Sequence, residues 1–527
     1  MSTQETTTQV VKNSAMISAY SALGFASALL IDILIAARFG LSQQTDAFFV
    51  AFTIPQLIAS ILLVAFSVVL VPLLSKVIIE EGKPSLWRIS SNMANLSLLG
   101  LGALGVIGSL SAPLLIRILG AGLDRAAQEL AISLSTWLFL MVIPLGAVEV
   151  FKATLNSLRI FAFPAATVLM RNSVTLLTVV LLSRSLGISA LVVGYVLGAW
   201  FQLFFLGLAL LTRGFRYHFV FEWREPRTAE ALRNLRHPVA GAILGQSNIL
   251  IERFLASFLP VGLVSALVYA RRILRAVDYI FIGSISTAFL PRLSTQTAQN
   301  RLVPFRQSLV LAVKLTVFVS MPVAIGIMTL SERTVTVLFQ RGAFDQSAVN
   351  STAMLLTLYV IGIPAIAILQ ILNASYYALG DTKTPFYSRL VMLGLYGLLA
   401  FLLFYLLQAS GLALALTLSR VITALVITWL LNRQLGFLDS DLIAFAAKIS
   451  VASALMGGVL LGLQAIDIRE LQGLGSLFSQ VFWLAIAVAI GVGVYILLLL
   501  LLRVPEVRRM TELIRVSSNR VRFKPRS

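Results

Sequence analysis

The sequence has no cysteine, only two histidines and little charge among its 527 residues. Without cysteine, disulfides, thiolate metal sites and thiol catalysis are excluded. His218 and His237 both fall in one polar stretch, which excludes histidine proton relays inside a membrane. Charged residues make up 12% of the chain and hydrophobic residues 58%, whereas soluble globular proteins have about 25% charged residues. We therefore expect an all-α polytopic membrane protein.

Nucleotide-binding and catalytic motifs are absent as well. No G-x-x-x-x-G-K-S/T loop occurs, so ATP-driven transport by this chain alone is not expected. Nothing resembles a paired-carboxylate or Ser/His catalytic site, so we expect neither an enzyme nor a metal site or cofactor. A coupling ion, H⁺ or Na⁺, is left open.

Apolar stretches of about 20 residues, long enough to cross a bilayer, recur along the whole chain. We predict fourteen transmembrane helices, near residues 14–38, 46–78, 90–119, 127–151, 161–183, 187–212, 238–259, 263–290, 307–330, 347–379, 385–407, 411–432, 442–466 and 477–502. The first span is too long for the apolar core of a signal peptide, so no cleavable signal is expected.

The formal net charge of +19 is spread unevenly over the predicted loops. When residues towards the ends of spans are assigned to the adjacent loops, the N-terminus, the even-numbered loops and the C-terminal tail hold 27 of the 41 Lys and Arg residues. The odd-numbered loops hold 7, and 7 lie within spans. Positive residues are enriched in cytoplasmic loops, so both termini are predicted to be cytoplasmic. Orientation and contact with anionic membrane lipids explain the charge, so no nucleic-acid partner is expected.

The sequence repeats itself at a distance of about 220 residues. Residues 45–75 and 264–294 align without a gap and share eight identities, including Pro72 with Pro291. Residues 153–164 and 374–385 have the same length, and each stretch joins the fourth helix of its set to the fifth. Spans 1–6 and 7–12 are therefore predicted to be duplicated bundles, related by a pseudo-twofold axis along the membrane normal as in alternating-access transporters.

This duplication predicts five regions. They are an N-lobe (1–212), a basic cytoplasmic linker that contains a surface helix (213–237), a C-lobe (238–432), two extra helices (433–502) and a basic cytoplasmic tail (503–527).

The stretch YARRILRAVD, residues 269–278, places three arginines in the middle of the eighth span. Each arginine near the centre of a membrane helix costs about 2.5–3.5 kcal/mol on insertion scales. At about 100° per residue, Arg271, Arg275 and Asp278 share one helix face, and Arg272 lies at its edge. One interpretation is a water-filled cavity that accepts an anion. The other is internal ion pairing, in which Asp278 neutralises Arg275.

Further polar residues lie in other spans. Candidates for ion coupling or interhelical pairing are Asp32, Glu149, Glu252, Asp278 and Arg420. Pairing is the favoured interpretation for these: Asp32 or Glu149 with Arg171, and Glu252 and Arg253 with different helices. Arg420 is placed to face the same cavity as helix 8. Asp46 and Gln56 in span 2 are candidate substrate contacts, and Asp46 is equally explained as a carboxylate at a helix N-terminus.

Two motifs carry a family resemblance. FGLSQQTDAFFVAFTIPQL (39–57) and VLFQRGAFDQSAV…ASYYALGDTKTPF (337–386) resemble the MviN/MurJ-type lipid II flippases, in the superfamily of the multidrug (MATE-type) exporters and polysaccharide-unit flippases. The resemblance runs over essentially the whole chain. It implies fourteen helices with an extra terminal pair. It also implies transport of the undecaprenyl-pyrophosphate-linked peptidoglycan precursor from the inner to the outer leaflet.

The chain departs from this family pattern in its charges. The family carries arginines in helices 1 and 2, whereas LGFASALLID (23–32) and IPQLIASIL (54–62) contain none. In helix 8, Tyr269, Ala270 and Arg272 match the family's Y-A-x-R, and Arg271 and Arg275 stand where acidic residues are common. The cationic charge is thus expected to be concentrated on helix 8.

Our leading hypothesis is a lipid II flippase that works by alternating access in the bacterial cytoplasmic (inner) membrane, with Arg271, Arg272 and Arg275 binding the pyrophosphate. Three alternatives remain: a flippase for another lipid-linked oligosaccharide, a MATE-like exporter, and a non-transporting scaffold for envelope assembly. The expected partners are a polyprenyl-linked glycan lipid, anionic membrane lipids and cell-wall synthesis proteins. The expected oligomeric state is a monomer.

Overall fold

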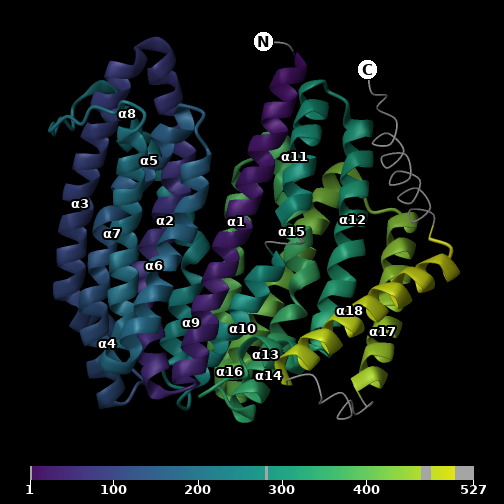
Figure 1. Cartoon of the computed structure of the whole chain (residues 1–527). Helices are drawn as coiled ribbons and strands as arrows, with labels where there is room; N and C mark the ends of the chain where they lie inside the picture. Colours follow the sequence, from purple (N-terminus) through teal and green to yellow (C-terminus); the bar gives the residue numbers. More distant parts are fainter. Residues whose placement is uncertain (1–2, 279–282, 465–475, 505–527) are drawn as a thin grey trace, which may run out of the picture. The chain divides into compact units, whose positions relative to one another are not determined.

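The computed structural model describes residues 3–278, 283–464 and 476–504, and every regular element in these ranges is a helix (Figure 1). The elements are α1 (Thr3–Phe39), α2 (Gln43–Glu80), α3 (Gly82–Leu119), α4 (Arg125–Leu138), η1 (Phe139–Met141), α5 (Val142–Ser157), α6 (Ala162–Leu186), α7 (Ser189–Leu211), α8 (Pro226–Gln246), α9 (Asn248–Ala256), α10 (Leu263–Val277), α11 (Gly283–Ala298), α12 (Leu302–Thr329), α13 (Ser331–Phe339), α14 (Gln346–Val360), α15 (Ile363–Ala378), α16 (Lys383–Leu435), α17 (Ser440–Gln464) and α18 (Ser476–Leu501). Nearly all of the predicted tail lies outside the described residues.

Within the described ranges, eleven helical stretches are long and apolar enough to cross a membrane, which confirms the polytopic all-α class. One of them, α16, has 53 residues and would be about 80 Å long as a single helix, far more than a bilayer needs. Its backbone breaks at Gln408 (φ 52°, ψ −125°), so α16 consists of two helices, at the places of the predicted spans 385–407 and 411–432. The predicted seventh and eighth spans each contain two shorter helices, α8 with α9 and α10 with α11.

The chain forms two compact units. Unit 1 comprises Met1–Val268 with Arg341–Ala348, and unit 2 comprises Tyr269–Gln340 with Val349–Ser527. The core of unit 1 contains Leu74, Trp87 and Leu206 from α2, α3 and α7. The core of unit 2 contains Leu309 and Ile449 from α12 and α17. The division lies inside α10, later than the predicted linker.

The linker lies with unit 1 because ion pairs bind it to the end of α2 and the beginning of α3. These pairs are Arg88–Glu222 at 2.8 Å, Arg227–Glu80 at 2.5 Å and Arg227–Glu81 at 2.8 Å. Glu225 caps α8 by accepting hydrogen bonds from the N–H groups of Arg227 and Thr228. The predicted linker helix is therefore present, and it continues to Gln246 in the seventh span.

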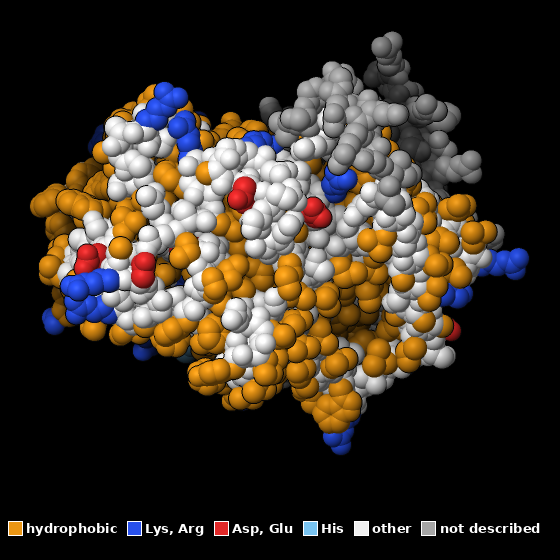
Figure 2. Space-filling view, turned by 90° about the horizontal axis from the view of Figure 1, so that it is seen from below, with side chains coloured by type: hydrophobic (Ala, Val, Ile, Leu, Met, Phe, Trp, Pro, Cys, Tyr) orange, Lys and Arg blue, Asp and Glu red, His pale blue; other side chains and the backbone are white. Residues whose placement is uncertain are grey.

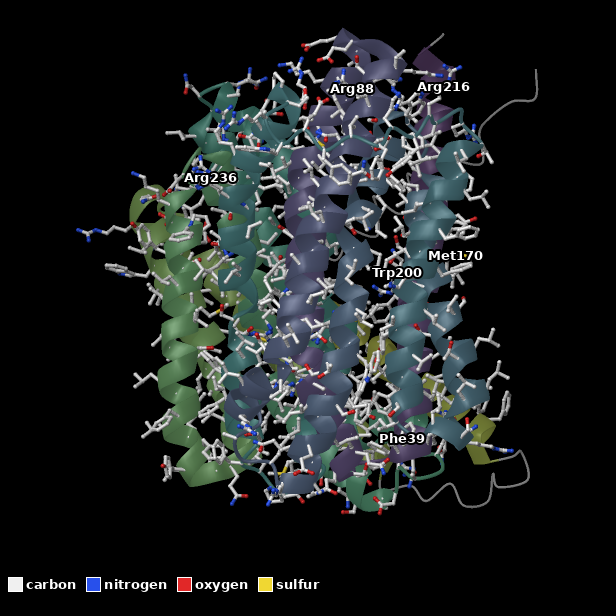
Figure 3. All side chains as sticks on the ribbon, turned by 90° about the vertical axis from the view of Figure 1, so that its left-hand side faces the viewer. Phe39, Arg88, Met170, Trp200, Arg216 and Arg236 are labelled. Carbon is white, nitrogen blue, oxygen red and sulfur yellow. The ribbon has the colours of Figure 1, made fainter. Side chains whose placement is uncertain are left out.

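The loops of unit 1 separate into two sets, as alternating membrane crossings require. Three hydrogen bonds join odd-numbered loops: the Gln43 amide to Asp124, the Gly122 N–H to Ser257 at 3.0 Å, and the Ala343 N–H to the Ala37 carbonyl at 2.9 Å. The even-numbered loops meet in the linker contacts above. Figure 3 shows Arg88 and Arg216 at one end of unit 1 and Phe39 at the other. On the face seen from below, charged side chains are few and scattered (Figure 2).

A turn geometry recurs at an offset of 221 residues. Helices α5 (Val142–Ser157) and α15 (Ile363–Ala378) have the same length and begin and end 221 positions apart. The turns that follow use the same hydrogen bonds: Leu158 to Thr154 and Ile160 to Leu155 in one, Leu379 to Ser375 and Asp381 to Tyr376 in the other. Arg159 and Gly380 both have positive φ, at 60° and 80°. Pro164 and Pro385 are each the third residue of the next helix. The local geometry therefore supports the predicted repeat.

Candidate functional site

The arginine-rich stretch forms the second part of α10, and it is amphipathic. One side is buried and consists of Tyr269, Ala270, Ile273, Leu274 and Val277. On the other side Arg275 is exposed, and Arg271 and Arg272 are half-buried. The helix therefore turns its arginines away from the core, as the 100° spacing predicts.

Asp278 lies at the end of this cationic face. Its carboxylate interacts electrostatically with Arg420 of α16 and with Arg275 of its own helix. The structure thus brings three of the predicted residues together in unit 2. The Asp278 carboxylate thus interacts with two guanidinium groups. The ion-pairing interpretation included that of Arg275 but not that of Arg420. The four arginines 271, 272, 275 and 420 with Asp278 carry a formal charge of +3. Phosphate binding by them stays a prediction.

Asp46 is bound entirely within unit 1. Its carboxylate accepts hydrogen bonds from the Gly262 N–H at 2.5 Å and from the Ser265 N–H and hydroxyl at 2.8 and 2.5 Å. Only 2% of Asp46 is exposed. The carboxylate therefore caps the N-terminus of α10, where a negative charge complements the helix dipole. Asp46 lies in the first turn of α2, as expected, and its carboxylate also caps α10. Its role as a substrate contact stays a prediction.

The other predicted polar residues have local neighbours. Glu149 forms an ion pair at 2.8 Å with Lys152, one turn along α5, a partner that we did not predict. We expected Glu252 and Arg253 to contact different helices. The Arg253 guanidinium lies 3.7 Å from the Glu252 carboxylate. Two further candidates are Asp32, buried in α1, and Gln56, half-buried in α2. Ion coupling by any of them stays a prediction.

Two glycines escaped the sequence reasoning. A Cβ on Gly40 would lie 2.3 Å from the Ala343 carbonyl oxygen, and a Cβ on Gly342 would lie 2.2 Å from the Ala37 carbonyl oxygen. Both glycines have positive φ, at 59° and 56°. Only glycine fits such a close backbone approach, which holds Gly342 and Ala343 against the end of α1. In the sequence, these positions are marked only by the dipeptides Phe39-Gly40 and Arg341-Gly342. Neither dipeptide indicates which backbone segment the glycine contacts.

Two charged groups outside the spans, Asp381 and Arg227, have pKa values that are shifted by their contacts. The Thr384 hydroxyl and backbone N–H donate to Asp381 at 2.5 and 3.0 Å and hold the pKa of that carboxyl below its ordinary value. Contacts with Glu81 and Glu80 raise the pKa of Arg227, so it stays charged. Among the described residues, no group of three or more His, Asp or Glu side chains is arranged to hold a metal ion.

Sequence comparison places most of the chain in one family. The family model described as "Lipid II flippase MurJ" matches residues 35–480. A probable lipid II flippase MurJ of Vibrio cholerae is 28% identical over 469 residues, which cover 86% of this chain and 89% of the relative. A lipid II flippase MurJ of Burkholderia cenocepacia is 26% identical over 378 residues, covering 70% and 73%.

Solved structures show the same fold. A lipid II flippase MurJ in an inward closed conformation has a TM-score of 0.77 at 24% identity, covering 93% of this chain and 98% of that one. An inward-facing multidrug resistance transporter of the MATE family has a TM-score of 0.66 at 15% identity, covering 79% and 94%. At these identities the likeness concerns the fold alone.

Proposed function

The chain belongs to the lipid II flippase MurJ family, and from this membership we propose that it carries lipid II, the polyprenyl-pyrophosphate-linked peptidoglycan precursor, from the inner to the outer leaflet. The match of the family model over residues 35–480 is the observation that carries the proposal. The protein is then a transporter and not an enzyme, and it acts in peptidoglycan synthesis as a multi-pass protein of the bacterial inner membrane.

Alternating access between two six-helix lobes is the proposed mechanism. To the eleven membrane-length stretches, the division of α16 into two helices adds one crossing, and α8–α9 and α10–α11 add one crossing each, which gives fourteen. The repeated turns at an offset of 221 support a duplication. Asp46 and Ser265 hold equivalent positions in the aligned stretches 45–75 and 264–294, and they hydrogen-bond to one another. Equivalent residues meet at a twofold axis, so this contact supports a pseudo-twofold arrangement.

The cationic face of α10 is the proposed headgroup site. A pyrophosphate-linked sugar cannot enter hydrocarbon without its water, because burying charged groups costs many kcal/mol. Arg271, Arg272 and Arg275 would replace that water with charge-assisted hydrogen bonds, and the polyprenyl tail would stay in the lipid. An inside-negative potential favours outward movement of an anion by about 2.3 kcal/mol per charge per 100 mV. We propose no specific coupling ion, and a monomer as the working unit.

A flippase for another lipid-linked oligosaccharide is the second candidate. The observation that favours it is the lack of arginine in residues 23–32 and 54–62, where the family carries cationic residues. A different distribution of charge suits a different headgroup. Export of organic cations is disfavoured, because the α10 face would repel them.

Complementation tests the proposal. A strain depleted of its lipid II flippase is supplied with this chain, and exposure of the lipid II headgroup on the outer leaflet is measured directly. Growth together with restored exposure supports lipid II transport. Failure of both, in a strain where the protein is inserted, overturns it and favours the second candidate. Reporter fusions after Arg224 and after Pro525 should read cytoplasmic, and one at Gln408 external, if the proposed orientation holds.

A further inference from the structure

The first part of the linker has no regular secondary structure and displays aromatic side chains. Backbone groups of this segment are bound by α3: Asn95 donates to the carbonyls of His218 and Val220 at 3.2 and 3.0 Å, and Asn92 exchanges two hydrogen bonds with the backbone of Glu222 at 2.7 and 2.9 Å. Phe219, Phe221 and Trp223 are 79%, 44% and 60% exposed, so these three side chains are directed outwards.

This aromatic ribbon, Phe219, Phe221 and Trp223, has a defined depth along α3. The exposed apolar side chains of α3 run from Leu99 to Ile118. At 1.5 Å per residue they cover about 28 Å, close to the ~30 Å of a bilayer's hydrocarbon core. Asn95, which binds the backbone on both sides of Phe219, lies one helical turn before Leu99. The ribbon therefore begins where the hydrocarbon ends and continues outwards past Asn92.

Basic side chains accompany the ribbon. Arg213, Arg216 and Arg224 are exposed, and the Arg224 guanidinium lies 4.6 Å from the centre of the Trp223 ring. Glu222 is paired with Arg88, so its negative charge does not oppose binding of an anion. Phe219 and Phe221 contact one another edge to face at 5.0 Å. Figure 3 shows Arg216 at the end of unit 1 opposite Phe39.

We propose that residues 213–224 are an interfacial anchor that binds anionic phospholipid of the adjacent leaflet. The aromatic ribbon inserts at the boundary between headgroups and acyl chains, where amphipathic rings are favoured. The three arginines bind the lipid phosphates. Because α3 holds the backbone, the ribbon is ordered before it meets the lipid, so little conformational entropy is lost on binding. The anchor does not depend on which lipid-linked glycan is transported.

Site-directed spin labelling tests this proposal, and the absence of cysteine makes every introduced cysteine unique. The full chain carrying Phe219→Cys or Phe221→Cys is labelled and reconstituted in vesicles of phosphatidylglycerol and phosphatidylcholine. Leu99→Cys on the lipid-facing side of α3 is the apolar control, and Lys83→Cys at the start of α3 is the aqueous control. Collision with oxygen and with a nickel chelate is measured by electron paramagnetic resonance.

Labels at residues 219 and 221 should collide preferentially with oxygen, as at residue 99. A preference for the nickel chelate, as at residue 83, would overturn the proposal and leave the ribbon as a surface for a protein partner. Because both phenylalanines are exposed, their replacement should not disturb folding.

The arginines are tested in the Phe221→Cys background. Replacing Arg213, Arg216 and Arg224 by Gln should shift the label towards the nickel chelate in phosphatidylglycerol vesicles, by roughly fivefold per arginine. In vesicles of phosphatidylcholine alone the same replacement should have little effect. An equal shift in both kinds of vesicle would show that lipid charge is not recognised and would overturn the anionic part of the proposal.

Discussion

Residues 124–211 and 345–432 form the same backbone features 221 positions apart. Asp124 and Asp345 each accept a hydrogen bond at 2.8 Å from the N–H three residues later, at the starts of α4 and α14. Gly187 ends α6 at φ 55° and ψ −136°, and Gln408 breaks α16 at φ 52° and ψ −125°. Caps and turns recur in both stretches, which we propose to be copies of one bundle, although few side chains are the same.

The charges do not recur. Glu149 and Lys152, which pair in α5, correspond to Gln370 and Asn373 in α15, and Arg420 corresponds to Ala199. Backbone turns accept few residue types, so they persist after a duplication. Ionisable side chains inside a membrane are expensive and are kept where they have a task. The comparison therefore indicates that Glu149, Lys152 and Arg420 each act only in the stretch that carries them.

The largest expected effect is a loss of lipid II flipping on replacement of Arg275, a charge that has no counterpart in the other copy. Arg275 of α10 corresponds to Gln56 of α2 in the alignment of residues 264–294 with 45–75. Arg275→Ala should reduce lipid II flipping roughly 10- to 100-fold, the value of a hydrogen bond to a charged group. Arg275→Lys should also impair it, because lysine lacks the planar fork that grips phosphate oxygens.

Gln56→Ala is the matched control and should retain most of the transport. Flipping is measured together with the amount of inserted protein, since removing a mid-membrane charge does not hinder insertion. Equal losses in the Arg275 and Gln56 variants would contradict the idea that charge acts in one copy. Unchanged transport after Arg→Ala at 271, 272 and 275 in turn would contradict the anion site itself.

A smaller effect is expected where the two copies meet. Asp46→Ala removes three hydrogen bonds and strands two N–H groups of α10, so it should lower the free energy of unfolding by about 3 kcal/mol. Ser265→Ala removes one of these bonds and should lower it by about 1 kcal/mol. Thermal unfolding of the purified variants provides the measurement. If Ser265→Ala were the more harmful, the carboxylate would not be the main cap of α10.

The repeated turns predict changes of opposite sign. Gln408 has a backbone conformation that favours glycine, and its counterpart is Gly187. Gln408→Gly should raise the free energy of unfolding, and Gly187→Gln should lower it, each by about 1–2 kcal/mol. Melting temperatures test the pair. Destabilisation by both replacements would show that the two turns differ in backbone strain.

The smallest effect is a pH dependence present in one turn only. The pKa of Asp381 is lowered by Thr384, so its contribution to stability is present above the ordinary pKa of aspartate and is lost as the pH falls through the lowered value. Asp381→Ile, which copies Ile160 of the other turn, should remove this acid-sensitive part, less than about 1 kcal/mol for a surface group. Melting curves at pH 6 and pH 3 compare the two proteins. If the difference in melting temperature between pH 6 and pH 3 were the same in both proteins, Asp381 would make no pH-dependent contribution to stability.

Much of the fold could be predicted because apolar length and turn residues are local signals. The break near Gln408 was expected between the spans 385–407 and 411–432, and Pro164 and Pro385 marked the repeated turn. The cap of α10 could not be predicted, because Asp46 and Gly262 lie 216 residues apart in sequence. The Glu149–Lys152 pair could have been recognised from its i, i+3 spacing. The face of α10 followed from helical periodicity, but which ligand it serves depends on groups far away in the chain.

The eight residues Arg341–Ala348 belong to unit 1, whereas the residues on both sides of them belong to unit 2. Gly342 is seated against the end of α1, only two peptide links from Gln340 of unit 2. Two links span at most about 7 Å, so this segment acts as a short tether. While Gly342 stays seated, Gln340 cannot move farther than that from the end of α1. A longer separation of the chain at this point requires Gly342 to leave its position against α1.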